Sequence, residues 1–86
     1  MLSIINKLSE IQKNFSEIYY SRNINSERET FSKYNRELSL IVNSINYSGV
    51  SSHEERTLMS LIEDCNYFKK ELNRELNAAF ANIFKL

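Results

Sequence analysis

Three stripes of apolar residues, each at the three- and four-residue spacing of an α-helix, run through this chain of 86 residues. Such spacing keeps one face of a helix apolar, and that face is stable only when another element covers it. The third stripe is about half as long again as either of the others. The chain therefore predicts three helices that pack together, with the last one left partly uncovered. The stripes are Ile4, Leu8, Ile11, Phe15 and Ile18; then Phe31, Tyr34, Leu38, Ile41, Val42 and Ile45; then Leu58, Leu61, Ile62, Cys65, Phe68, Leu72, Leu76, Ala79, Phe80, Ile83 and Leu86.

These stripes predict helices over residues 3–21, 27–47 and 52–85 of a single domain, residues 1–86. The chain has one glycine and no proline. Helix interiors disfavour both residues, whereas strand-rich folds use them in turns. Short links make consecutive helices antiparallel. The expected fold is an all-α antiparallel three-helix bundle with a long C-terminal helix.

Two capping boxes and one glycine mark the expected helix ends. In a capping box, a Ser or Thr hydroxyl accepts from the backbone N–H three residues on, and an acidic side chain there reaches back. Ser26 with Glu29, and Ser52 with Glu55, have this spacing. Gly49 can adopt the left-handed conformation that closes a helix C-terminus, so we expect it to end the second helix.

Helix lengths predict an uncovered segment at the end of the third helix. At 1.5 Å per residue, helices of about 20, 20 and 33 residues span about 30, 30 and 50 Å. The first two then cover roughly residues 52–72, and residues 73–86 overhang. The overhang could pair with a second copy of the chain, or it could dock into a groove of another protein. Alternatively, the helix could break near residues 73–77, so that a fourth short helix folds back onto the bundle. Its apolar residues, which we predict to bind the partner, are Leu76, Ala79, Phe80, Ile83, Phe84 and Leu86.

No pattern of residues predicts catalysis, a metal site or a cofactor site. His53 is the only histidine and Cys65 the only cysteine, whereas a zinc site needs more ligands than these two. Cys65 lies within the apolar stripe, so we expect a buried, unreactive thiol. Glu63 and Asp64 point about 100° apart on a helix, so they form no acid–base pair. We therefore expect a protein that is not an enzyme and that binds no cofactor or metal.

The charges of the chain argue against nucleic-acid and membrane partners. Eleven basic and eleven acidic side chains cancel, whereas nucleic-acid binding depends on an excess of basic side chains. Lys69, Lys70 and Arg74 come closest to a basic patch, but Glu71 and Glu75 lie among them. No apolar run is long enough to span a membrane, and the N-terminus does not have the pattern of a signal peptide. Together with the lone cysteine, this favours a cytoplasmic protein.

A second candidate surface lies on the expected second helix. Leu40 and Tyr47 are seven residues apart and point away from the second stripe, so they would share the outer face of that helix. With Tyr67 they form a second predicted partner-binding spot.

Two short segments resemble parts of known families. The turn Tyr47-Ser48-Gly49 and the run from Tyr67 to Glu71 are similar to the aromatic-x-Gly turn and the tail signal of the small WXG-type proteins of type VII secretion, with Tyr in place of Trp. The segment Leu40–Leu61, with its Ser-x-x-Glu-Arg-x-Leu run at Ser52, Glu55, Arg56 and Leu58, resembles the helical bacteriocin immunity proteins. Both segments are short, and they assign the chain to no family.

The expected function is non-enzymatic binding of another protein, in the manner of an inhibitor, immunity protein, antitoxin or secretion chaperone. The apolar face of the C-terminal helix would enter a groove of the partner. The alternative is a scaffold protein that only self-associates, and a nucleic-acid-binding regulator is a weaker one. We expect a homodimer or a complex with a different protein.

Overall fold

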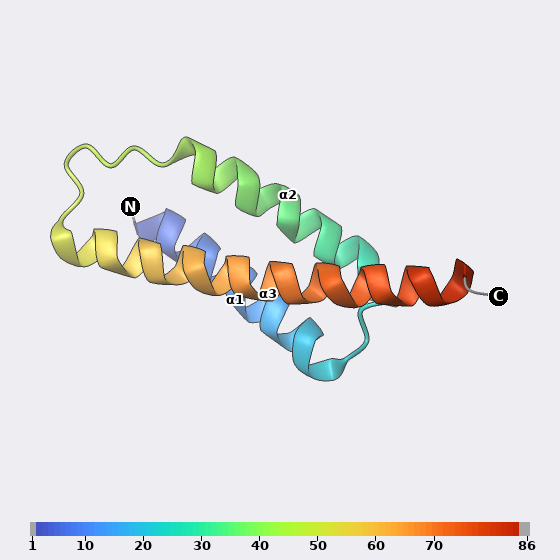
Figure 1. Ribbon diagram of the computed structural model, residues 1–86. Helices are drawn as coiled ribbons and strands as arrows, with labels where there is room; N and C mark the ends of the chain where they lie inside the picture. Colours follow the sequence, from blue (N-terminus) through green and yellow to red (C-terminus); the bar gives the residue numbers. More distant parts are fainter. Residues whose placement is uncertain (1, 85–86) are drawn as a thin grey trace.

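The computed structural model describes the backbone of residues 2–84 and the side chains of residues 2–78. Three helices, α1 (Leu2–Ser21), α2 (Arg28–Ser44) and α3 (Ser52–Phe84), account for nearly all of this part of the chain (Figure 1). The predicted all-α three-helix bundle is therefore confirmed. The fourth short helix is wrong, because α3 runs unbroken through residues 73–77.

Helix α1 holds the bundle together. It runs in the same direction as α3 and opposite to α2 (Figure 1). It packs most extensively on α3 and also on α2, whereas α2 and α3 scarcely touch. The sequence predicted that both shorter helices would cover α3, and α1 supplies most of that cover.

The core is formed by the faces that the three stripes predict. The Phe15 and Phe31 rings meet edge to face, with their centroids 5.4 Å apart, and join α1 to α2. Ile24 is also buried, although it lies in the link between these helices, where no stripe indicates a core position. The fully buried or nearly buried apolar residues are Leu8, Ile11, Phe15, Ile18, Ile24, Phe31, Leu38, Leu58, Cys65 and Leu72.

Helix α1 ends at a residue in the left-handed conformation. Arg22 directly follows the last helical residue and has a φ of 55°. Glycine is favoured at this position because it has no Cβ to clash with the backbone. The short link that follows places Ile24 against the core, so this sharp turn is the geometry that the link requires.

The predicted capping box at Ser26 is wrong. The Ser26 hydroxyl donates to the Asn23 carbonyl at 3.1 Å. The Glu27 backbone N–H also donates to that carbonyl, at 3.2 Å. Glu27, not Ser26, precedes the first residue of α2, and no side chain caps this end. Because Ser26 lies inside the turn of the link, its hydroxyl is used there.

Helix α2 ends at Ser44, three residues before the predicted boundary. Ile45 is extended, with φ −68° and ψ 124°. Gly49 does adopt a positive φ, 80°, but it serves a turn in the link, where the Val50 N–H donates to the Tyr47 carbonyl at 3.2 Å. The link between α2 and α3 is therefore seven residues long (45–51), longer than the predicted one.

The capping box of α3 lies one residue earlier than predicted. The Glu54 N–H donates to the Ser51 hydroxyl at 3.2 Å, and the Ser51 N–H donates to the Glu54 carboxylate at 3.3 Å. Glu54 also accepts from the Ser51 hydroxyl at 3.0 Å. Ser52 and Glu55 have the same spacing, but Ser52 is already the first residue of α3, and the Glu55 N–H donates to the Ser51 carbonyl at 2.9 Å.

Replacing Ser51 should therefore destabilise the protein more than replacing Ser52. We expect Ser51→Ala to lower the free energy of unfolding by about 1 kcal/mol, because orphan N–H groups at the start of α3 lose their acceptor. Ser52→Ala should change it by only a few tenths of a kcal/mol. Urea unfolding followed by circular dichroism measures both. A larger loss in Ser52→Ala would place the cap at the predicted residue instead.

Replacing Arg22 with glycine should stabilise the protein. The left-handed conformation costs a residue with a Cβ about 1–2 kcal/mol, and glycine removes this cost. Glycine also makes the unfolded chain more flexible, which raises the entropy lost on folding and offsets part of the stabilisation. We expect Arg22→Gly to raise the free energy of unfolding by roughly 0.5–1 kcal/mol. Arg22→Ala is the control, because it removes the charge and keeps the Cβ. Equal stabilisation by both variants would show that backbone strain is not the cause.

Candidate partner-binding surfaces

The predicted overhang begins later than residue 73. Leu72 is fully buried, and Leu76 is half-buried against the core. The reason is the position of α2: Leu38 and Val42 line one hollow with Asn66 and Lys69 of α3. At that register the start of α2 lies opposite about residue 79 of α3. Leu76 is therefore part of the edge of the bundle rather than of a free segment.

Beyond this edge, α3 continues as a regular helix to Phe84, past the ends of α1 and α2 (Figure 1). Of the other residues predicted to bind a partner there, the side chains of Ala79, Phe80, Ile83 and Phe84 lie outside the described side chains, and Leu86 lies outside the described residues. In a continuous helix, positions 76, 80 and 83 follow Leu72 at the spacing of one face.

The predicted spot that combines Leu40 and Tyr47 is not a helical face, because α2 ends before Tyr47. Leu40 is 65% exposed and lies beside Lys7 and Ile41, next to the start of α1. Tyr47 is 47% exposed and lies in the link. Whether either residue binds a partner stays a prediction.

Tyr67 belongs to a cluster of four aromatic rings that joins α1 to α3. Its ring lies 5.6 Å from that of Phe68, whose ring lies 5.5 Å from Tyr19 and 6.4 Å from Tyr20. The neighbouring Tyr67 phenol raises the pKa of Tyr19, and partial burial and the Glu71 carboxylate raise it further. Sequence reasoning missed this cluster, because only the packing of α1 on α3 brings the two pairs of adjacent aromatics together.

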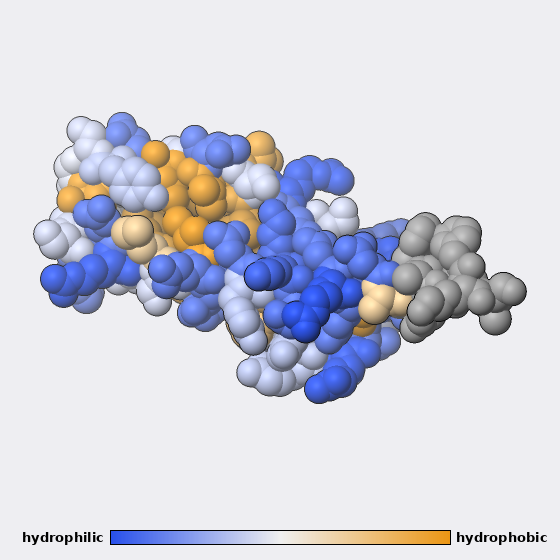
Figure 2. Space-filling view, viewed as in Figure 1, coloured by the Kyte–Doolittle hydropathy of each residue, from blue (hydrophilic) through white to orange (hydrophobic). Residues whose placement is uncertain are grey.

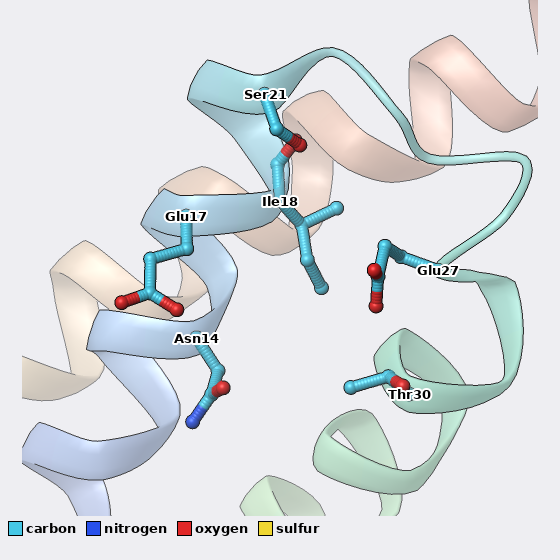
Figure 3. Close-up of a pocket in the computed structure, with 6 residues that line it drawn as sticks. All are labelled: Asn14, Glu17, Ile18, Ser21, Glu27 and Thr30. Carbon is cyan, nitrogen blue, oxygen red and sulfur yellow. The ribbon is translucent and has the colours of Figure 1, made fainter.

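A small pocket lies between the end of α1 and the start of α2 (Figure 3). Glu27, which directly precedes α2, and Thr30 of α2 point into it, whereas Glu17 turns away from Glu27 (Figure 3). The Ser21 hydroxyl donates to the Ile18 carbonyl of its own helix at 3.0 Å. The other residues that line this pocket are Asn14 and Ile18.

The charged residues singled out by the sequence lie apart or pair locally. The Gln12 amide donates to the Asp64 carboxylate at 2.9 Å and joins α1 to α3, while Glu63 is exposed. Arg74 forms an ion pair of 3.6 Å with Glu71. His53 is exposed in the first turn of α3. Within the described residues, no three His, Cys, Asp or Glu side chains gather where they could hold a metal ion.

Cys65 is fully buried where α3 packs against α1, as the sequence predicted. Its thiol donates to the Leu8 carbonyl at 3.7 Å. Burial, with a smaller contribution from the Asp64 carboxylate, raises the pKa of the thiol to about 11. Because the thiolate is the reactive form, Cys65 is protonated and protected at neutral pH.

Alkylation of Cys65 should therefore report on the integrity of the bundle. With a pKa about two units above its ordinary value, the native thiol at pH 8 should react with iodoacetamide roughly 100-fold more slowly than the unfolded chain. The rate for the native protein should rise about tenfold with each pH unit and level off near pH 11, and it should reach the rate of the unfolded chain as denaturant unfolds the protein. Mass spectrometry of quenched samples measures both rates. Fast labelling of the folded protein at pH 8 would contradict the burial.

No family model, curated protein or solved structure matches the chain. Among the described residues, no helix is both long enough and apolar enough to cross a membrane.

Proposed function

We propose that this protein acts by binding another protein through the C-terminal turns of α3, without enzymatic activity. It would serve as an inhibitor, an immunity protein, an antitoxin or a secretion chaperone. The observation that carries the proposal is the length of α3, which is one unbroken helix to Phe84 and extends beyond α1 and α2 (Figure 1). Because α3 does not fold back on the bundle, we propose that a protein partner or a second copy covers the stripe.

The energetics favour a covered stripe. Positions 80 and 83 continue the face that Leu72 and Leu76 present to the core. Burying a large apolar side chain stabilises by about 1.5–3 kcal/mol, so two such residues contribute several kcal/mol to a complex. An amphipathic helix that lies in an apolar groove of its partner uses this energy.

The composition of the segment supports a protein groove over a charged ligand. Residues 76–84, Leu-Asn-Ala-Ala-Phe-Ala-Asn-Ile-Phe, contain no charged side chain. Phosphate groups are bound mainly by Lys and Arg, and this segment has neither. We also propose a cytoplasmic location, which the lone cysteine supports.

Aspartate substitutions on the two sides of the helix test the proposal. Phe80→Asp and Ile83→Asp should each weaken partner binding by at least about 30-fold, because each loses about 2 kcal/mol or more of apolar burial. Ala78→Asp and Ala81→Asp are the matched controls, since both positions lie away from the stripe. Thermal unfolding first establishes that all four variants remain folded.

Light scattering after size-exclusion chromatography gives the mass of each variant, and affinity purification with the wild-type chain as bait gives the partner. A dimer that only the stripe variants dissociate would favour the self-associating alternative. The proposal is overturned if the stripe variants keep both the assembly and the retained partner.

A further inference from the structure

A groove lies between α2 and α3, where residues 38–43 of α2 and residues 66–69 of α3 line one hollow. These helices scarcely contact each other, whereas α1 packs on both. Figure 2 shows hydrophobic side chains gathered between α2 and the N-terminal half of α3, with mostly hydrophilic side chains along the next stretch of α3. The face therefore divides into an apolar section and a polar section.

The apolar section is formed by residues that the core does not fully cover. Val42 of α2 lines a hollow with Asn66 and Lys69 of α3. Ile62 lies one turn before Asn66 and two turns before Lys69, so it shares their face of α3. Both Val42 and Ile62 are only half-buried. Ile41, by contrast, lies beside Lys7 on the other flank of α2.

The groove is open because of the link between α2 and α3. Since α2 ends at Ser44 and the link occupies residues 45–51, α2 is displaced toward the C-terminal half of α3. The first turns of α3 then face the extended link instead of a helix (Figure 1). Ile45 and Val50 of the link are half-buried, so the link covers this end only in part.

The polar section carries positive charge. Lys69 is half-buried, beside the hydroxyl of Ser39 and the amides of Asn43 and Asn66. A second hollow continues along α3 and is lined by Asn66, Lys69, Lys70, Asn73, Arg74 and Asn77. Neither hollow has a carboxylate in its lining.

One basic side chain of the polar section forms an ion pair with a carboxylate, and others do not. Arg74 pairs with Glu71. Within the described side chains, no carboxylate lies within 4.0 Å of the Lys69 or Lys70 ammonium. The groove therefore offers the Lys69 ammonium without a counter-charge directly after its apolar section, with the exposed Lys70 beside it in the second hollow.

We propose that this groove binds an amphipathic helix of a different protein, with an acidic residue that follows its apolar face. The apolar residues of that helix would contact Val42 and Ile62. Because Lys69 lies seven residues after Ile62, an Asp or Glu about two turns from the apolar contact would meet it. A second copy of the chain fits less well, since its protruding segment, residues 76–84, has no acidic side chain.

A peptide selection identifies the preferred occupant. Random peptides of about 16 residues, long enough for four helical turns, are displayed and selected on the immobilised full chain. The enriched peptides should show apolar residues at three- and four-residue spacing, followed by Asp or Glu. Enrichment of peptides without acidic residues would overturn the proposal.

Charge reversal then tests the assigned contact. Lys69→Glu should weaken the binding of a selected peptide at least 10-fold by fluorescence anisotropy, and replacing the acidic residue of the peptide with Lys should restore it. Lys13→Glu, on an exposed position of α1, is the matched control. Equal affinity for wild type and Lys69→Glu would overturn the proposal.

The apolar section is tested with Val42→Asp against the control Leu2→Asp, at an exposed apolar position of α1, after unfolding curves show that both fold. Only Val42→Asp should weaken peptide binding. A wild-type dimer that Val42→Asp dissociates would overturn the proposal in favour of a second copy. Phe80 and Ile83 belong to the other proposed binding surface. The groove variants should not change binding at that surface, so each of the two proposals can be tested and refuted independently of the other.

Discussion

The structure depends on the burial of one face of α1 between the other two helices. Phe15 packs on Phe31 of α2. The Leu8 backbone carbonyl accepts a hydrogen bond from the Cys65 thiol of α3. Because α2 and α3 scarcely touch, neither could hold its position without this face. Burial of apolar area is the main favourable term in folding. In this protein, most contacts between helices involve α1, a helix of 20 residues.

Two surfaces lie outside the packing around α1. One is the groove between α2 and α3, which is open because these two helices scarcely contact each other. The other is the C-terminal part of α3, which extends past its neighbours because α3 is the longest helix (Figure 1). The two surfaces also differ in chemistry, because the groove carries Lys69 and Lys70 whereas residues 76–84 are uncharged. The two proposed binding surfaces therefore differ in the partner chemistry that each would select.

The links between the helices determine how much of α3 is covered. Arg22 adopts its left-handed conformation at the end of α1, and the buried Ile24 ties the following turn to the core. The link of residues 45–51 shifts α2 along α3, and Ile62 and Leu76 of α3 are both only half-buried. A displacement of a few residues in a link thus changes how far the apolar side chains of α3 are covered.

The sequence by itself determined the helices and their buried faces, because the spacing of apolar residues is a local property of a helix with 3.6 residues per turn. It predicted the burial of Phe15, Leu38 and Cys65 correctly, and it placed the cap of α3 within one residue of Ser51. Only the tertiary structure decided that α1 would be the shared partner, that Ile24 and Leu76 would join the core, and that Tyr19 would meet Phe68. These features depend on the conformation of links and on contacts between residues far apart in the chain, and a helical repeat carries no information about either.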